Sequence, residues 1–219
     1  TDLSKIDSKV ENNIAMTTNN SRLYTFGWGQ NGQLGHGGTL NECIPHLVGL
    51  KKEPVQVCCG SRHTVVLMRS GDVWSWGKGD DGQLGHSSTD NELSPKKIVN
   101  DHMTTSISMI ACRGPHVLAL DNLGNVWSWG ANVNGQLGLG FRSDSSMPFQ
   151  SSPMLVSSLC DQNKTIVHIA AGRQFSAAIT DKGELYTWGV NEDGQLGSGE
   201  GKNHSGPRKV SNLPAIKNN

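Results

Sequence analysis

Three arginines are the first candidates for recognising a partner. Each of them comes just before a short strand-like run. Arg62, Arg113 and Arg173 lie one to three residues ahead of three such runs. The planar guanidinium group suits carboxylate and aromatic partners. If the runs are equivalent strands, the three arginines gather on one face of the fold. We expect either a partner-binding surface there, or arginines that are solvated or paired with acidic groups within the fold.

A second candidate set consists of polar side chains that vary at matching positions of a recurring loop. Its members are Lys78, Asp80, Asp81, Asn132, Asn134, Glu192 and Asp193. Polar residues that vary within an otherwise constant loop are suited to contact with a partner. They are equally expected in any solvated loop. The Ser-rich insert at 140–153 adds Phe141 and Phe149 as candidate apolar anchors for a partner.

The sequence contains no pattern typical of a catalytic or metal site. The HExxH motif, the phosphate-binding Gly-rich loop and a Ser-His-Asp arrangement are all missing. His63 and His116 recur at one position, but Phe175 fills it in a third copy, which argues against a shared set of ligands. We therefore expect no enzymatic activity, no metal and no cofactor.

The cysteines favour packing roles in a reducing compartment. The five are Cys43, Cys58, Cys59, Cys112 and Cys160, and no two have the Cys-x-x-Cys spacing of zinc and redox motifs. Positions 58, 59 and 112 align with alanines at 170 and 171, as expected for small buried residues. We expect a cytoplasmic or nuclear protein.

The charge balance excludes several functions. The chain of 219 residues has 19 Lys and Arg against 19 Asp and Glu, a formal net charge of zero. Nucleic-acid-coating proteins rely on strongly basic surfaces, so direct nucleic-acid binding is not expected. No run approaches the ~18 apolar residues of a membrane span.

An internal repeat organises the elements that must position these residues. A thirteen-residue signature, such as LYTFGWGQNGQLG, occurs at 23–35, 73–85, 126–138 and 185–197. Its Gln residues are 50, 53 and 59 residues apart, and the insert at 140–153 accounts for the longest spacing. A Gly-rich block with a His or Phe precedes three copies, and a Pro-containing block follows each copy.

Each unit consists of short predicted strands. In one unit the β-rich runs are Val55–Cys59, His63–Met68 and Asp72–Trp76, and Gly71 and Gly183 sit in predicted hairpin turns that need positive φ. Period and strand content predict an all-β propeller of four-stranded blades, with about four repeats. We expect the repeats over 12–213, with flexible tails at 1–11 and 214–219. The first residue, Thr1, favours a fragment of a longer chain.

The residues of the signature are expected to have structural roles. Glycines permit tight loop turns, leucines are expected to pack between blades, and glutamines to satisfy loop backbone groups. The signature residues are Gly32, Gln33, Leu34, Gly35, Gly82, Gln83, Leu84, Gly85, Gly135, Gln136, Leu137, Gly138, Gly194, Gln195, Leu196 and Gly197.

The chain resembles the regulator of chromosome condensation repeat family. The resemblance rests on the Trp-Gly-x-x-x-x-Gly-Gln-Leu-Gly signature and the Ala/Cys-Gly-x-x-His block, and it spans about residues 12–213. It implies a seven-bladed propeller. Because this chain has four signatures, we expect either a piece of a longer propeller, which we favour, or a short form that closes in another way.

The resemblance leaves several functions open. A non-enzymatic protein–protein interaction module is the leading hypothesis, with a protein partner of unknown identity. The alternatives are a guanine-nucleotide exchange factor for a small Ran-like GTPase, a targeting domain of a larger ubiquitin ligase, and chromatin binding through the arginines. The family's founding exchange factor places an Asp before the blade His. Arg62, Pro115 and Gln174 stand at the matching positions, which argues against exchange activity.

Overall fold

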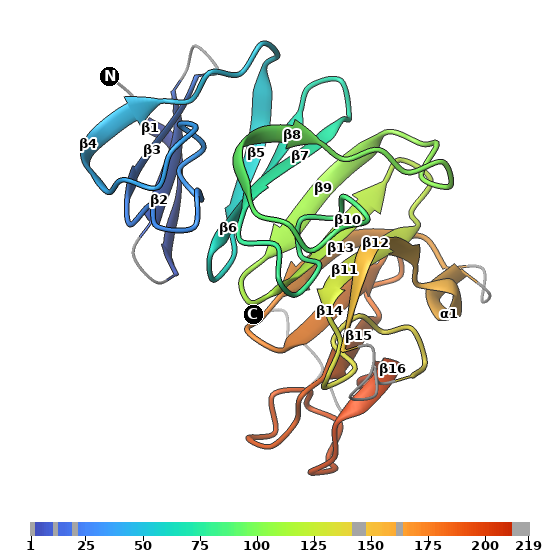
Figure 1. The fold of residues 1–219 in the computed structure, drawn as a ribbon. Helices are drawn as coiled ribbons and strands as arrows, with labels where there is room; N and C mark the ends of the chain where they lie inside the picture. Colours follow the sequence, from blue (N-terminus) through green and yellow to red (C-terminus); the bar gives the residue numbers. More distant parts are fainter. Residues whose placement is uncertain (1–2, 11–12, 19–21, 142–147, 161–163, 212–219) are drawn as a thin grey trace, which may run out of the picture.

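The chain folds into four antiparallel sheets of four strands each, as the sequence predicts. The computed structural model describes residues 3–10, 13–18, 22–141, 148–160 and 164–211. In Figure 1 the four sheets follow one another in a curved row, from the blue N-terminal sheet to the red C-terminal one. We call these sheets blades 1 to 4. The described residues include one short helix, α1 (Ser157–Cys160).

In every blade the strands follow one another in sequence order. Blade 1 contains β1 (Leu3–Val10), β2 (Asn13–Thr18), β3 (Leu23–Gly27) and β4 (Glu42–Leu47). Blade 2 contains β5 (Pro54–Cys59), β6 (His63–Met68), β7 (Val73–Gly77) and β8 (Glu92–Lys97). Blade 3 contains β9 (Ile107–Cys112), β10 (His116–Asp121), β11 (Val126–Ala131) and β12 (Phe149–Leu155). Blade 4 contains β13 (Ile166–Ala171), β14 (Phe175–Thr180), β15 (Leu185–Gly189) and β16 (His204–Lys209).

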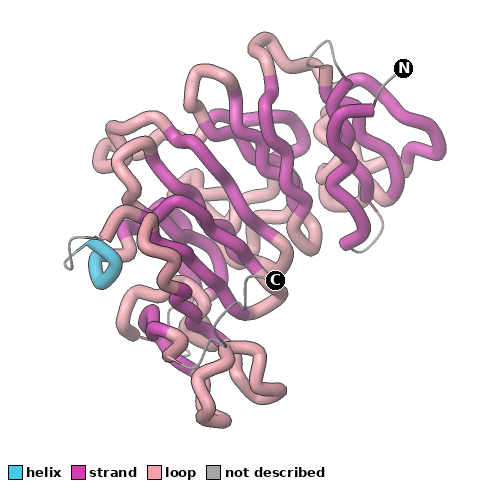
Figure 2. The backbone as a smooth tube through the Cα atoms, turned by 180° about the vertical axis from the view of Figure 1, so that it is seen from behind, coloured by secondary structure: helices cyan, strands magenta, loops and turns pink. Residues whose placement is uncertain are grey.

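The first strand of each blade lies innermost. β1 contacts β5, β5 contacts β9, and β9 contacts β13, so these strands meet in series on one side of the row. Figure 2 shows the same succession from behind. The outer strands β4, β8 and β16 are mostly exposed or half-buried, as expected for edges facing solvent.

The core lies between blades because each inner sheet is covered on both faces. Strands β6 and β10 are buried along their whole length, although strict alternation would expose every second residue. One apolar cluster joins blade 2 to blade 3, with Val65 and Leu67 against Ile110 and Trp129. Similar clusters join blade 1 to blade 2 and blade 3 to blade 4.

The signature loops connect each blade to the next. The indole N–H groups of Trp76, Trp129 and Trp188 donate to the main-chain oxygens of Gln33, Gln83 and Gln136 in the preceding blade, at 3.0, 3.0 and 2.9 Å. All three tryptophans are fully buried. A Cβ on Gly82 would lie 2.8 Å from the Gln150 carbonyl oxygen of β12, so glycine allows this loop to reach blade 3.

The predicted role of the signature glutamines, which is to satisfy loop backbone groups, is confirmed. Each Gln Oε1 accepts a hydrogen bond from the main-chain N–H two residues earlier, at 2.8–2.9 Å. The leucines at 34, 84, 137 and 196 are at most 2% exposed. The hairpin glycines Gly71 and Gly183 have φ of 81° and 76°, as predicted.

The N-terminal prediction needs correction. The segment 1–11, expected as a flexible tail, contains β1, which pairs with β2 through partners such as Ile6 and Met16. Blade 1 therefore begins at Leu3. Without β1, β2 would expose a row of unpaired backbone groups, which a fourth strand satisfies. The predicted tail at 214–219 lies outside the described residues.

Candidate functional site

The predicted partner-binding residues share one end of the blades. Antiparallel order places the loop between a blade's first and second strands, and its signature loop, at the same end. We call this the loop end, and we call residues 60–62, 113–115 and 172–174 the arginine loops.

The three arginine loops are in contact with one another. The Ser61 N–H donates to the Gly114 carbonyl oxygen at 3.4 Å. Gly114 in turn lies so close to the third loop that a Cβ there would be 1.8 Å from the Arg173 carbonyl oxygen. The expected gathering of the arginines at one end is therefore observed.

This contact predicts a cost for adding one methyl group. We expect Gly114→Ala to lower the free energy of unfolding by about 1–3 kcal/mol, because backbone on the neighbouring blade must move. Gly38→Ala is the matched control, since a Cβ there meets nothing within 4 Å, and it should stay within about 0.5 kcal/mol. Urea unfolding followed by circular dichroism measures both. Equal stabilities of the two variants would contradict the close packing.

The guanidinium groups are available to a partner. Arg62, Arg113 and Arg173 are exposed, and no ion pair or side-chain hydrogen bond joins them to another described residue. The alternative that acidic groups of the fold neutralise them is therefore not observed in the described part of the chain. The Arg62 guanidinium carbon lies 5.7 Å from the centre of the Trp28 ring, within cation–π range.

Two of the three arginines share a pocket. Arg62 and Arg173 line a hollow of about 270 Å³ together with Lys78, and its other lining residues are Ser61, Asp81, Gln83, Pro115 and Gln174. Arg113 does not line it. Lys78 is held beside Arg62 because its main-chain N–H donates to the Arg62 carbonyl oxygen at 2.9 Å. Its ammonium group pairs with Asp80 at 3.0 Å.

The other predicted contact residues divide into exposed and structural ones. Glu192 and Asp193 are exposed, whereas Asn132 is fully buried and bonds the Leu137 N–H and the Phe141 carbonyl oxygen at 3.1 Å each. The candidate role of Asn132 as a contact residue is therefore wrong. The sequence did not single out Asn191, which holds the Leu196 N–H of the blade 4 loop in the same way at 2.9 Å.

The two candidate anchors differ as well. Phe141 is 49% exposed. Phe149 is half-buried in β12, pairs with Ala131 and lies against Gly82 of blade 2. Because it contacts blade 2, Phe149 belongs to the packing between blades 2 and 3.

The recurrent histidines are buried and neutral. His63 and His116 are fully buried at the starts of β6 and β10. Burial lowers the pKa of His63 to about 3, and the neighbouring His116 adds to the effect. Burial also lowers the pKa of His116 to about 4, while its Nε2 lies 2.9 Å from the Ser176 hydroxyl. These rings are packing elements, consistent with Phe175 at the third position.

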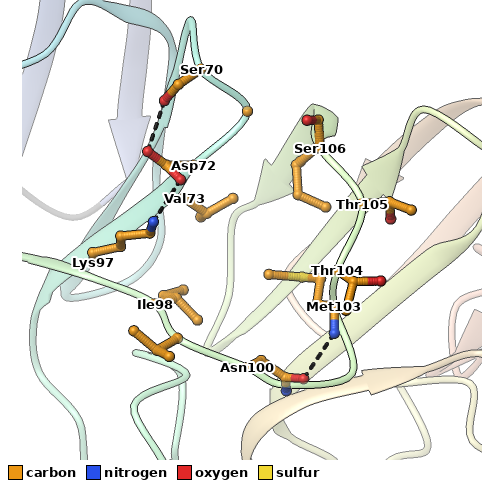
Figure 3. Close-up of a pocket in the computed structure, with 13 residues that line it drawn as sticks. Ser70, Asp72, Val73, Lys97, Ile98, Asn100, Met103, Thr104, Thr105 and Ser106 are labelled. Atoms are coloured by element: carbon orange, nitrogen blue, oxygen red, sulfur yellow. Dashed lines mark hydrogen bonds and ion pairs between the residues drawn. The ribbon is translucent and has the colours of Figure 1, made fainter.

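A second pocket, at the opposite end of blades 2 and 3, has its charges satisfied internally. Figure 3 shows its 13 lining residues, with Asp72 linked to Ser70 and Lys97. The Asp72 carboxylate pairs with Lys52 at 2.5 Å and Lys97 at 2.8 Å, and these contacts lower its pKa. Thr105 donates to Asp121 at 2.7 Å. This pocket therefore offers a ligand little unpaired charge.

The described residues contain neither a metal-binding cluster nor a helix that could span a membrane. No group of three or more His, Cys, Asp or Glu side chains within them has the arrangement of a metal site. None of the helices that the structure describes is long and apolar enough to span a membrane.

Comparison with known proteins identifies the family. The model of the RCC1-like domain matches residues 4–218. The chain belongs to the RCC1-like domain family. The match starts before residue 12, in agreement with β1 as part of blade 1.

Relatives of this RCC1-like domain include large proteins. It is 38% identical over 189 residues to the ultraviolet-B receptor UVR8 of Arabidopsis thaliana, covering 85% of this chain and 41% of that protein. It is 36% identical over 207 residues to the human E3 ubiquitin-protein ligase HERC2, covering 93% of this chain and 4% of the ligase. The domain therefore spans less than half of either relative.

Solved structures show the same propeller fold. Human WBSCR16 superposes with a TM-score of 0.80 at 23% identity, over 95% of this chain and 53% of that one. Prp20p from Saccharomyces cerevisiae superposes with a TM-score of 0.81 at 21% identity, over 96% and 51%. The RCC1-like domain thus has four propeller blades and spans about half of each of these chains.

Proposed function

We propose that this RCC1-like domain is a non-enzymatic protein-interaction module whose contact surface is the loop end. The observation that carries this proposal is the set of three exposed arginines on mutually packed loops. Arg62, Arg113 and Arg173 have no acidic partner among the described residues. A buried inter-blade frame holds the loops that carry them, so a partner meets a largely preorganised surface.

The relatives support a binding role within larger assemblies. The study of Prp20p describes its binding to Gsp1p and histones. That likeness is one of fold, at 21% identity, and it supports protein partners as a class. The match to HERC2 supports a module within a longer protein, as in the targeting-domain hypothesis. We do not propose nucleotide exchange, because no carboxylate stands at 62, 115 or 174.

The proposed compartment is the cytoplasm or nucleus. It rests on the cysteine spacing, which lacks the pattern of a disulfide framework. The partner-capture experiment described below therefore uses cytosolic and nuclear extracts.

The test is capture by the domain before and after charge reversal. The triple variant Arg62→Glu, Arg113→Glu and Arg173→Glu should reduce recovery of specific partners by at least about tenfold, measured by quantitative mass spectrometry. The control reverses three exposed cations away from the loop end, Lys51, Lys182 and Arg208, with the same change in net charge. It should retain the partners. Unchanged recovery by the loop-end variant would refute the proposed surface.

A further inference from the structure

The pocket lined by Arg62 and Arg173 joins parts of three blades. Blade 2 contributes Ser61, Arg62, Lys78 and Asp81, while blades 3 and 4 contribute Pro115, Arg173 and Gln174. The contacts between Ser61 and Gly114, and between Gly114 and Arg173, fix these loops relative to one another. The packing of these loops thus brings Arg62 and Arg173 to one pocket.

The position of each loop residue relative to the recurrent His or Phe explains which of the arginines line this pocket. Arg62, Pro115 and Gln174 stand one residue before the recurrent His or Phe, and all three line it. Ser61 and Arg173 stand two residues before that position and also line it. Arg113 stands three residues before and does not. In the repeat, Arg113 is therefore offset by one residue from the position of Arg173 and by two from that of Arg62.

The lining chemistry favours an anion. Arg62 and Arg173 have no ion pair within the described residues, so each offers a planar fork of N–H donors. The Ser61 hydroxyl and the Gln174 amide add neutral donors. The charge of Lys78 is offset by Asp80, at 3.0 Å. Two unpaired arginines that line one pocket suit a carboxylate, which accepts paired hydrogen bonds from a guanidinium group.

Asp81 decides which kind of anion fits. This half-buried residue lines the same pocket, and its carboxylate has no ion pair within the described part of the chain. A phosphodiester offers acceptors only, so Asp81 would repel it without gaining a hydrogen bond. An acidic peptide offers a carboxylate to the arginines and main-chain N–H groups to Asp81. The mixed lining therefore favours a peptide over the phosphodiester groups of a nucleic acid.

We propose that this pocket binds a glutamate or aspartate side chain of an acidic peptide segment in a partner protein. Arg62 and Arg173 pair with its carboxylate, and Asp81 accepts a hydrogen bond from the neighbouring main chain. This inference rests on the proposed function, because it names the partner chemistry of the same loop end. It adds a defined subsite that excludes Arg113.

A binding assay with single charge reversals tests the proposal. The probe is a short fluorescein-labelled peptide of alternating glutamate and glycine, titrated with the whole chain at low salt and followed by fluorescence anisotropy. Arg62→Glu and Arg173→Glu should each weaken binding by at least about tenfold. Arg113→Glu, at the same end but outside the pocket, distinguishes the pocket from a diffuse basic surface and should weaken binding by no more than about threefold. Lys182→Glu, away from the loop end, is the matched control for the change in net charge and should leave binding unchanged.

Two further arms distinguish the source of the anion. Inorganic phosphate and a single-stranded oligonucleotide of equal charge are titrated as competitors, and the peptide should bind more tightly than either. Asp81→Asn should strengthen phosphate binding and reduce the preference for peptide. Tighter binding of phosphate or oligonucleotide to the unmodified chain would overturn the peptide assignment.

The outcomes separate this inference from the proposed function. Equal weakening by all three arginine reversals would mean a diffuse basic surface, which overturns the pocket but leaves the interaction face. No binding of the peptide, together with partner capture that still depends on the arginines, would also overturn the pocket alone. Loss of peptide binding confined to Arg62→Glu and Arg173→Glu would establish it. Circular dichroism of each variant confirms that the sheets are intact.

Discussion

Replacing Trp129 by alanine is expected to lower the free energy of unfolding by about 3–5 kcal/mol. The side chain is fully buried in the cluster between blades 2 and 3. Its indole N–H donates to the Gln83 carbonyl oxygen of blade 2 at 3.0 Å, and its ring lies against Gly85. Alanine would leave a cavity and an unsatisfied buried carbonyl, and each adds to the cost.

Trp129→Phe separates the cavity from the hydrogen bond. Phenylalanine keeps most of the ring and removes the donor, so we expect a smaller loss of about 1–2 kcal/mol. Blade 1 provides the natural precedent, because Phe26 occupies the matching position. Urea unfolding followed by circular dichroism gives both values. A cost for Trp129→Ala below about 1 kcal/mol would show that the signature loops do not join the blades energetically.

The strand pattern of this fold can be predicted from the sequence because the pattern repeats. The strands β5, β6 and β7 fall within one or two residues of their predicted ranges, since Gly-containing turns bound each run. The prediction fails at β1, where no recognisable copy of the repeat marks the strand. Its pairing with β2 comes from the need to complete a blade, which is a tertiary requirement.

The candidate site is only partly predictable from the sequence. Strand order alone places Arg62, Arg113 and Arg173 at one end. Their division into two pocket residues and one outside it depends on how three blades converge, which spacing along the chain does not specify. Lys78 joins the pocket because its N–H bonds the Arg62 carbonyl oxygen across the sheet. The prediction for Asn132 is wrong because, in sequence, a buried polar residue that bonds loop backbone cannot be told from an exposed one.

The buried histidines should make the stability of the domain depend on pH. His63 and His116 stay neutral in the folded state down to pKa values of about 3 and about 4, whereas in the unfolded chain each titrates near 6.5. Between these values the unfolded state binds more protons, so stability rises with pH in this window and falls on acidification. Each histidine contributes at most about 1.4 kcal/mol per pH unit.

His63→Phe should remove one of these contributions, since Phe175 shows that a repeat accepts phenylalanine there. Between pH 6.5 and 4.5 the stability lost on acidification should be smaller by about 2–3 kcal/mol than in the unmodified chain. This window lies above the titration of carboxyl groups such as Asp72, whose pKa is lowered by Lys52 and Lys97. The exposed His102, replaced by alanine, is the control for the removal of a histidine.

The measurement is urea unfolding at several pH values for the three chains. Comparison between chains cancels the titration of groups that they share, including His36 and His86. If His63→Phe and the unmodified chain lose stability in parallel, His63 is protonated at the same pH in both states and is not buried as described. A reduced slope for His63→Phe alone would show that the buried His63 ring stays neutral in the folded state. This ring covers Gly60 as the Phe175 ring covers Gly172.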